Sequence, residues 1–286
     1  MNTGLLLLLL LLLLLAGTLA AARPRPVTAL PTRLVEVQRT TARWRNRGLL
    51  LGVVVAIVSA QVGTLGRGLM LAGPLLALCV LLGVVLGELR VTAPPLAERR
   101  AVLEVRRVRD YVPRRLATVV AASISLLTAL LVTTTSMGSA DDLGRDGRWL
   151  ARQCSDVLSE ARGPWPGTFY SVPLAVVVGL GLIVAAVALR QVVRRPRQGS
   201  DLAADDALRH RAAETVTAAA GLLVAVPFAG VALLAGIGLS GISCAPASWT
   251  ALSTVLLLLV PVQLGLGAWC AGLLPGRRRI PAAVPG

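Results

Sequence analysis

The chain is a series of long apolar blocks separated by polar segments rich in arginine. A helix needs about 20 mostly apolar residues to cross the roughly 30 Å hydrocarbon core of a bilayer. Because lipid offers backbone groups no hydrogen-bond partner, such blocks must be helical. Seven blocks qualify, and none contains Asp, Glu, Arg or His: Leu5–Ala22, Leu49–Leu65, Gly68–Gly87, Leu116–Met137, Ser171–Leu189, Thr217–Ile242 and Leu252–Leu274. The pattern predicts an all-α, polytopic transmembrane bundle of seven helices that forms a single membrane domain over 1–286.

The connecting segments alternate between arginine-rich and arginine-poor. Segments 23–48, 90–115 and 190–214, together with the C-terminal tail, contain 24 of the 29 arginines, and the other connections contain five. Loops with an excess of positive charge stay in the cytoplasm. We therefore expect three basic inner loops, an outer loop over 138–170, an N-terminus outside and a C-terminus inside.

The first block permits a second interpretation, a cleaved signal peptide, because Ala20–Ala22 resembles a cleavage site. However, Met1–Gly4 has no basic side chain. Cleavage would also leave the arginines of 23–48 outside, against the bias of every later loop. A retained first helix is therefore favoured.

The composition agrees with a plasma-membrane protein. Hydrophobic residues make up 55% of the chain and charged residues 15%, and the mean hydropathy is +0.75, whereas soluble domains have about 25% charged residues. This excludes a disordered chain, a coiled coil and a small disulfide-rich domain. A net charge of +15 would suggest nucleic acid in a soluble protein. Here the inner-face arginines account for it, so we expect the lipid bilayer as partner and no nucleic acid.

The residue inventory argues against an enzyme. The chain has no lysine and one histidine, His210, in a polar stretch. These absences exclude a P-loop lysine, a Schiff base and a two-histidine metal site. We predict no catalytic residue, cofactor or metal, and interpret His210 as a solvated linker residue.

Ion-coupled transport is also disfavoured, because coupling sites usually need ionisable residues within the spans. Gln61 and Gln263 could line a path, but such groups more often form hydrogen bonds between helices. Glu88 and Glu214 lie at the inner ends of spans, and we expect them to pair with nearby arginines, Arg90 for Glu88 and Arg211 for Glu214.

The outer loop is predicted to form a short helix, because Leu150, Cys154, Val157 and Ala161 share one helical face. Trp165 and Tyr170, in the same loop, fit an interfacial aromatic belt, with a binding role as the alternative. Of the four cysteines, only Cys154 and Cys244 fall on the oxidising side, so we predict a disulfide between them.

The inner loop 90–115 contains a basic stretch with valines at helical spacing, bounded by Pro94 and Pro113. A basic amphipathic helix would lie on the membrane surface; plain positive-inside charge is the alternative. The candidate contacts to anionic lipid headgroups are Arg99, Arg100, Arg106, Arg107, Arg109, Arg114 and Arg115.

Three motifs, RVRDYVPRR, DDLGRDGR and PWPGTFYSVP, carry a resemblance to a family of uncharacterised multi-pass integral membrane proteins from high-GC actinobacteria. The resemblance covers most of the chain after residue 68. It implies an actinobacterial source and no mechanism.

Three function classes compete. We expect an integral plasma-membrane protein that is a non-enzymatic accessory, scaffold or sensor component acting through its outer loop. The alternative is a permease or transporter subunit for a neutral or hydrophobic solute. An intramembrane enzyme is disfavoured by the single histidine and the missing lysines.

Overall fold

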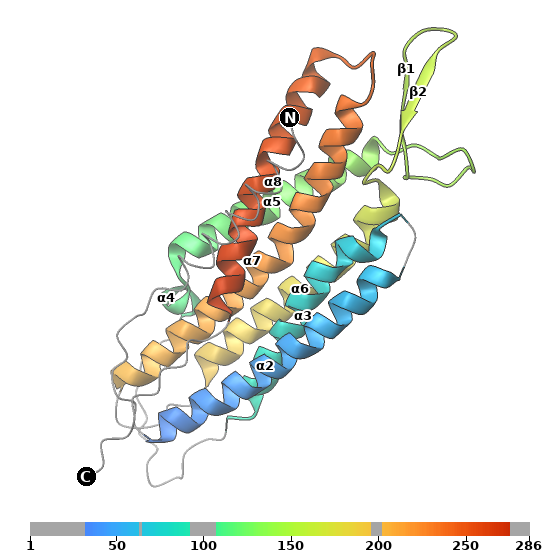
Figure 1. Cartoon of the computed structure of the whole chain (residues 1–286). Coiled ribbons are helices and arrows are strands. Elements are labelled where there is room, and N and C mark those ends of the chain that lie inside the picture. The colour runs from blue at the N-terminus through green and yellow to red at the C-terminus, as the bar shows by residue number, and fades with distance from the viewer. Residues whose placement is uncertain (1–31, 63–64, 92–106, 196–201, 275–286) are drawn as a thin grey trace.

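The computed structural model describes residues 32–62, 65–91, 107–195 and 202–274. These residues form helices and one short antiparallel hairpin of strands β1 (Leu150–Gln153) and β2 (Ser159–Arg162). The helices are α2 (Thr32–Gln61), α3 (Arg67–Leu89), α4 (Val108–Tyr111), α5 (Arg114–Ser136), α6 (Thr168–Arg194), α7 (Leu202–Ser240) and α8 (Ala247–Leu273). The long helices lie side by side in an elongated bundle, and the hairpin projects from one end (Figure 1).

Five helices, α3, α5, α6, α7 and α8, are long and apolar enough to cross a membrane. This confirms the prediction of a helical membrane protein. The predicted block Leu49–Leu65 falls mostly in the second half of α2, a longer helix whose first half is polar and rich in arginine. The apolar part of α2 is therefore too short for this helix to be among the five. The block Leu5–Ala22 lies outside the described residues.

Helix α7 forms the centre of the bundle. It contacts α3, α5, α6 and α8, and most of its apolar stretch is buried, unlike that of the other four candidate spans. Small side chains on α7, such as Ala219, Ala225 and Ala232, are fully buried. Because small residues let helix backbones approach closely, α7 can be packed on several sides at once.

Helices α2 and α3 pack with their backbones in contact. A Cβ added to Gly83 would lie 2.7 Å from the carbonyl oxygen of Trp44 and 3.1 Å from the Cα of Gly48. Only glycine fits at such a crossing. The outer surface of this pair is apolar, with Leu50 of α2 68% exposed, which is stable when lipid covers it.

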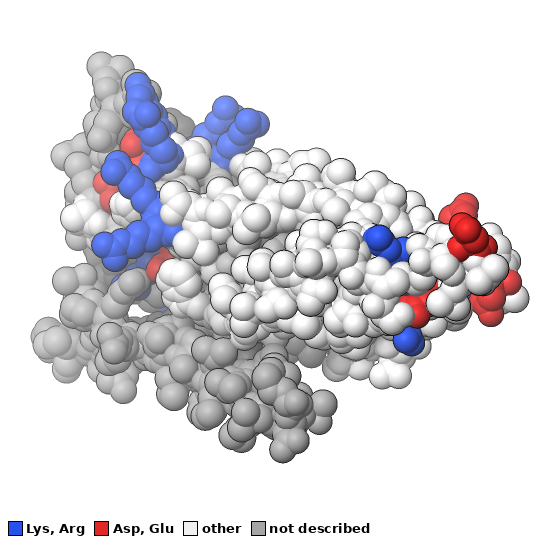
Figure 2. Space-filling view, turned by 90° about the horizontal axis from the view of Figure 1, so that it is seen from above, with Lys and Arg blue, Asp and Glu red and all other residues white. Residues whose placement is uncertain are grey.

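The two ends of the bundle differ in charge. The arginine-rich end comprises the first half of α2, helix α4, the start of α5, the end of α6 and the start of α7. The hairpin end comprises the hairpin and the connections around it. Figure 2 shows arginines gathered at the first end, a middle without charged side chains on the visible face, and mixed charges with exposed acids at the second end.

The predicted outer-loop helix is wrong, because the segment forms the β-hairpin. Leu150 pairs with Arg162 and Gln153 with Ser159. A helix of about ten residues is marginal by itself in water. Here cross-strand bonds and contacts with the α7–α8 connection stabilise an extended conformation instead. The spacing that suggested one helical face does not describe one surface, since Leu150 is buried and Val157 is 96% exposed.

Candidate functional site

The strongest candidate site is the hairpin platform, which we define as residues 138–167. It begins with a tight turn around Asp141. The Asp141 carboxylate accepts hydrogen bonds from the backbone N–H groups of Leu143 and Arg145, at 3.0 and 2.9 Å, and from the Arg145 guanidinium at 2.7 Å. Burial alone would raise the pKa of Asp141, but these bonds outweigh it and hold that pKa below its ordinary value. The carboxylate therefore stabilises the turn at neutral pH, and this contribution is lost as the pH falls through the lowered pKa.

Two glycines let the platform cross the start of α6. Gly147 has φ +69°, a left-handed conformation that favours glycine. A Cβ there would overlap Thr168, and a Cβ on Gly167 would lie 2.6 Å from the Gly147 carbonyl oxygen. The crossing brings the segments 141–148 and 164–173, two of the motifs noted above, directly together.

Trp165 attaches the platform to α5, and Tyr170, in the first turn of α6, attaches that helix to the connection between α2 and α3. Each is 1% exposed. The Trp165 indole N–H donates to the Thr134 carbonyl at 2.8 Å, and the Tyr170 hydroxyl donates to the Leu65 carbonyl at 2.6 Å. The predicted aromatic belt is therefore wrong for these two residues. The same burial contradicts the alternative that they present a binding surface.

A disulfide and two hydrogen-bonded contacts attach the hairpin to the connection between α7 and α8. Cys154 and Cys244, the pair expected from the topology, lie with Cα atoms 5.6 Å apart and their sulfurs joined. The Glu160 carboxylate accepts bonds from the Ser243 hydroxyl and from its N–H, and the Arg162 Nε donates to the Gly241 carbonyl at 2.8 Å. The bonds from Ser243 lower the pKa of Glu160.

The same region contains three residues whose side chains are of types that could bind a metal. One ligand atom each from Cys154, Glu160 and Cys244 lies within 4.8 Å of the others. Since both sulfurs are in the disulfide, neither is available as a thiolate, and the cluster is a covalent attachment in this structure.

The tip of the hairpin, held in place from its base, presents two aliphatic side chains next to the polar Ser155 and Asp156. Cys154 N–H donates to the Leu158 carbonyl at 2.8 Å, which closes the turn next to the disulfide. Val157 and Leu158 at the tip are both exposed. A tethered hairpin that presents aliphatic side chains outward is suited to contact another protein.

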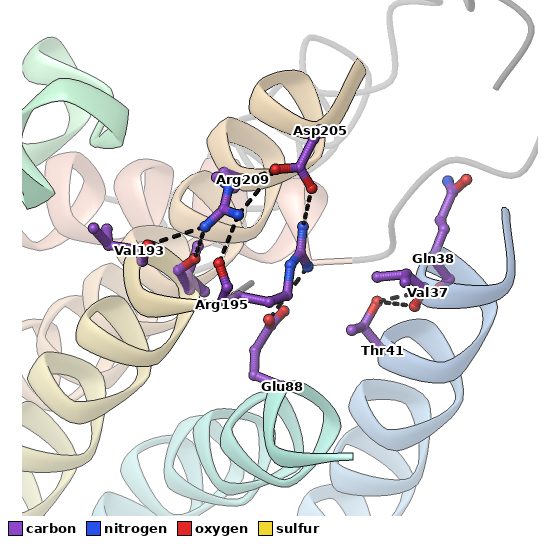
Figure 3. Close-up of polar contacts among 9 residues, drawn as sticks. Val37, Gln38, Thr41, Glu88, Val193, Arg195, Asp205 and Arg209 are labelled. Carbon is purple, nitrogen blue, oxygen red and sulfur yellow. Dashed lines mark hydrogen bonds and ion pairs between the residues drawn. The ribbon is translucent and has the colours of Figure 1, made fainter. Parts of the chain in front are cut away.

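The arginine-rich end contains a buried network of four charged side chains, Glu88 of α3, Arg195 after α6, and Asp205 and Arg209 of α7 (Figure 3). Arg195 lies between the two acids, 3.3 Å from Glu88 and 3.4 Å from Asp205. Asp205 also pairs with Arg209, at 2.9 Å. Two acids and two arginines leave no net charge in the network.

Arg209 also binds the end of α6. Its guanidinium donates to the carbonyls of Val192, Val193 and Arg195, at 2.8, 3.0 and 2.7 Å. The last carbonyls of a helix have no partner within the helix, so Arg209 completes α6 and joins it to α7. The structure thus ties three helices together at one point.

This network corrects one prediction. Glu88 does pair with an arginine, but the partner is Arg195 and not the nearby Arg90. The Arg90 guanidinium instead lies over the Trp44 ring, 5.1 Å from its centroid. Sequence proximity favoured Arg90, whereas the packing of α6 against α3 places Arg195 over Glu88.

The remaining polar candidates have structural surroundings. The Gln263 amide donates to the Ser123 hydroxyl at 3.3 Å, a buried contact between α8 and α5, and Gln61 is exposed at the end of α2. His210 is exposed on α7 rather than in a linker, with Nδ1 3.1 Å from the Tyr111 carbonyl oxygen.

Four predicted lipid contacts lie among the described residues. Arg107, Arg109, Arg114 and Arg115 are all exposed at the arginine-rich end, in or beside α4 and the first turn of α5. Arg99, Arg100 and Arg106 lie outside the described residues, as does most of the predicted surface helix. Headgroup contact therefore stays a prediction.

Comparisons with protein-family models, with curated proteins and with solved structures gave no match. The resemblance to the actinobacterial family consequently stays a prediction.

We predict that the cysteine pair resists alkylation. In unreduced, denatured membranes a maleimide–polyethylene glycol reagent should add to Cys79 and Cys270 only, and after reduction to all four cysteines. Cys154→Ser should destabilise the protein by at most about 4–5 kcal/mol, since the chain-entropy effect of a loop of this length is smaller when lipid already restrains the helices. Cys79→Ser is the control and should keep the disulfide. Four additions without reduction would contradict the bond.

We predict that breaking the buried network is costly. Glu88→Gln leaves Arg195 with one carboxylate, and removing one partner of a buried pair typically costs about 3–5 kcal/mol. Glu36→Gln, which changes an exposed acid at the same end, should have little effect. The measurement is unfolding of the purified protein by detergent titration. Equal losses of stability in Glu88→Gln and Glu36→Gln would show that the network does not stabilise the bundle.

Proposed function

We propose that this chain is a multi-pass protein of the plasma membrane, with seven spans, the N-terminus outside and the C-terminus inside. In this proposal it is a non-enzymatic accessory, scaffold or sensor component that contacts a partner through the hairpin platform. The arginine-rich end then faces the cytoplasm, where Arg107, Arg109, Arg114 and Arg115 can contact anionic headgroups.

Three features support membrane insertion in this orientation. Five helices are apolar enough to span, and their outward side chains include many exposed aliphatic residues. Of the 29 arginines, 24 belong to the segments assigned to the inner side, as the positive-inside rule requires. A cytoplasmic arginine-rich end also places Cys154 and Cys244 in an oxidising compartment.

The observation that carries the proposed role is the pair of exposed aliphatic side chains, Val157 and Leu158, at the tip of a tethered hairpin. Val157 is 96% exposed, three residues from Cys154 and the disulfide. A flexible loop would lose conformational entropy when a partner binds, whereas a hairpin held by the disulfide, Glu160 and Arg162 has already lost it. Rigid presentation of an aliphatic surface is more useful for recognition than for chemistry.

The role predicts a specific contact at the tip. A photoreactive amino acid at Val157, in cells of the native host, should give one discrete protein adduct in the presence of the intact disulfide. Leu143, also an exposed aliphatic residue of the platform, is the matched position and should give none. Loss of the Val157 adduct in Cys154→Ser would agree with rigid presentation. No adduct at Val157, or the same adducts at both positions, would contradict the role.

One observation favours the alternative, a permease subunit for a neutral or hydrophobic solute. An apolar cavity of about 300 Å³ lies between α2 and α3 on one side and α7 and α8 on the other, with Leu49, Leu76 and Val226 in its lining. Flux of a hydrophobic solute across proteoliposomes, blocked by Leu76→Trp, would favour this alternative over the accessory role.

A further inference from the structure

We propose that an open pocket at the hairpin end binds the phosphodiester headgroup of a net-anionic phospholipid from the adjacent leaflet. The pocket has a volume of about 430 Å³. Three arginines, Arg67, Arg145 and Arg148, line it together with Phe169. It is built by the start of α3, the segment 145–148 and the first turn of α6, so its walls come from three separate parts of the chain.

Two of these arginines are held on one aromatic ring. The guanidinium carbons of Arg67 and Arg148 lie 4.9 and 4.1 Å from the centroid of Phe169. Such cation–π contacts hold the planar guanidinium groups near the ring without using their N–H groups in an ion pair. The two positive guanidinium groups near one ring also repel each other, and a bound anion would offset this repulsion.

The charge of the pocket matches a single negative charge. Arg145 is paired with Asp141, and one further acid, Asp146, lines the pocket. Within the part of the chain that the structure describes, no carboxylate forms an ion pair with Arg67 or Arg148. Three arginines against two acids leave one positive charge, and a phosphodiester has one negative charge. Arginine binds phosphate oxygens through two parallel hydrogen bonds.

The α6 helix adds to this anion preference. Thr168 begins α6 and is one of the residues that line the pocket. The N-terminus of a helix has a partial positive charge and unpaired backbone N–H groups, so it favours an anion in this position. The helix end supplements the arginines and is not the basis of the site.

The other side of the pocket is apolar and continues along α6. Val172 lines the pocket, and Val172, Val176, Leu180 and Ile183 follow at i, i+4, i+8 and i+11 on one face. Each is more than half exposed. Gly179 lies within this stripe, and a Cβ there would meet nothing within 4 Å. A ligand that is anionic at one end and hydrocarbon along its length fits both parts, which favours a phospholipid over a free phosphate ion. This step rests on the proposed membrane insertion.

The test uses the full-length protein in nanodiscs of phosphatidylcholine that contain a trace of photoreactive lipid. The probe is phosphatidylglycerol with a diazirine in its acyl chain, and phosphatidylcholine with the same chain is the neutral comparison. Labelled peptides are mapped by mass spectrometry. We expect phosphatidylglycerol to label the stripe from Val172 to Ile183 about tenfold more than phosphatidylcholine does, since charge-assisted contacts decide the difference.

Variants assign the preference to the pocket. The double variant Arg67→Gln/Arg148→Gln should lose the excess labelling, whereas Arg39→Gln/Arg43→Gln, which removes two exposed arginines of α2 at the opposite end, should keep it. An intact Cys154–Cys244 disulfide in both variants checks the fold of the hairpin end. The comparison of the two lipids in the unaltered protein needs no variant. It therefore still tests the lipid preference if the variant Arg67→Gln/Arg148→Gln fails to fold.

The outcomes separate the site from the membrane proposal. Equal labelling of the α6 stripe by both lipids would overturn the site. Loss of the excess when millimolar inorganic phosphate is added would show a site for the free anion and overturn the lipid assignment. Absence of labelling on α6 and also on the exposed α8 residues Val255, Leu258 and Val262 would instead contradict membrane insertion itself.

Discussion

A charged side chain that leaves water without a partner destabilises a membrane protein more than most single contacts stabilise it. The bundle is organised around this constraint. Charged side chains lie at its two ends, and the four that are buried at the arginine-rich end, Glu88, Arg195, Asp205 and Arg209, neutralise one another. This pairing allows α7 to continue for 39 residues, from the buried charges through the centre of the bundle. The apolar packing of the other helices around α7 depends on it.

The hairpin end meets a different requirement, because its backbone leaves the helical pattern. Each polar group there must find a partner outside a helix. The turn around Asp141, the indole N–H of Trp165 and the carboxylate of Glu160 supply such partners, and the disulfide adds a covalent link. One end is therefore held by charge neutralisation between helices, and the other by side-chain contacts to backbone. The second arrangement leaves the hairpin tip and the arginine pocket open to the surroundings, which is why both proposals concern that end.

The sequence predicts the bundle well because long apolar blocks and lipid leave helices as the only choice. Local periodicity was a poor guide in the outer loop, where helical spacing from Leu150 to Ala161 suggested a helix. A segment of that length takes its conformation from tertiary contacts, here with Ser243 and Gly241, that no local pattern records. The same holds for Glu88, whose partner Arg195 is 107 residues away. Trp165 and Tyr170 are buried with hydrogen bonds to Thr134 and Leu65, which lie 31 and 105 residues away in the sequence. The pocket likewise brings Arg67 next to Arg145 and Arg148, which are far from it in the sequence.

The central claim is that the arginine-rich end faces the cytoplasm and the hairpin end faces outward. Paired reporter fusions at the C-terminus test it most directly. Alkaline phosphatase is active only outside the cytoplasm. Green fluorescent protein fluoresces only inside, because it does not become fluorescent when it is exported in unfolded form. The account predicts a fluorescent C-terminal fusion with a silent phosphatase. It also predicts that a phosphatase inserted after Leu143, in the hairpin platform, is active. An active phosphatase at the C-terminus together with a silent fluorescent fusion would contradict the account.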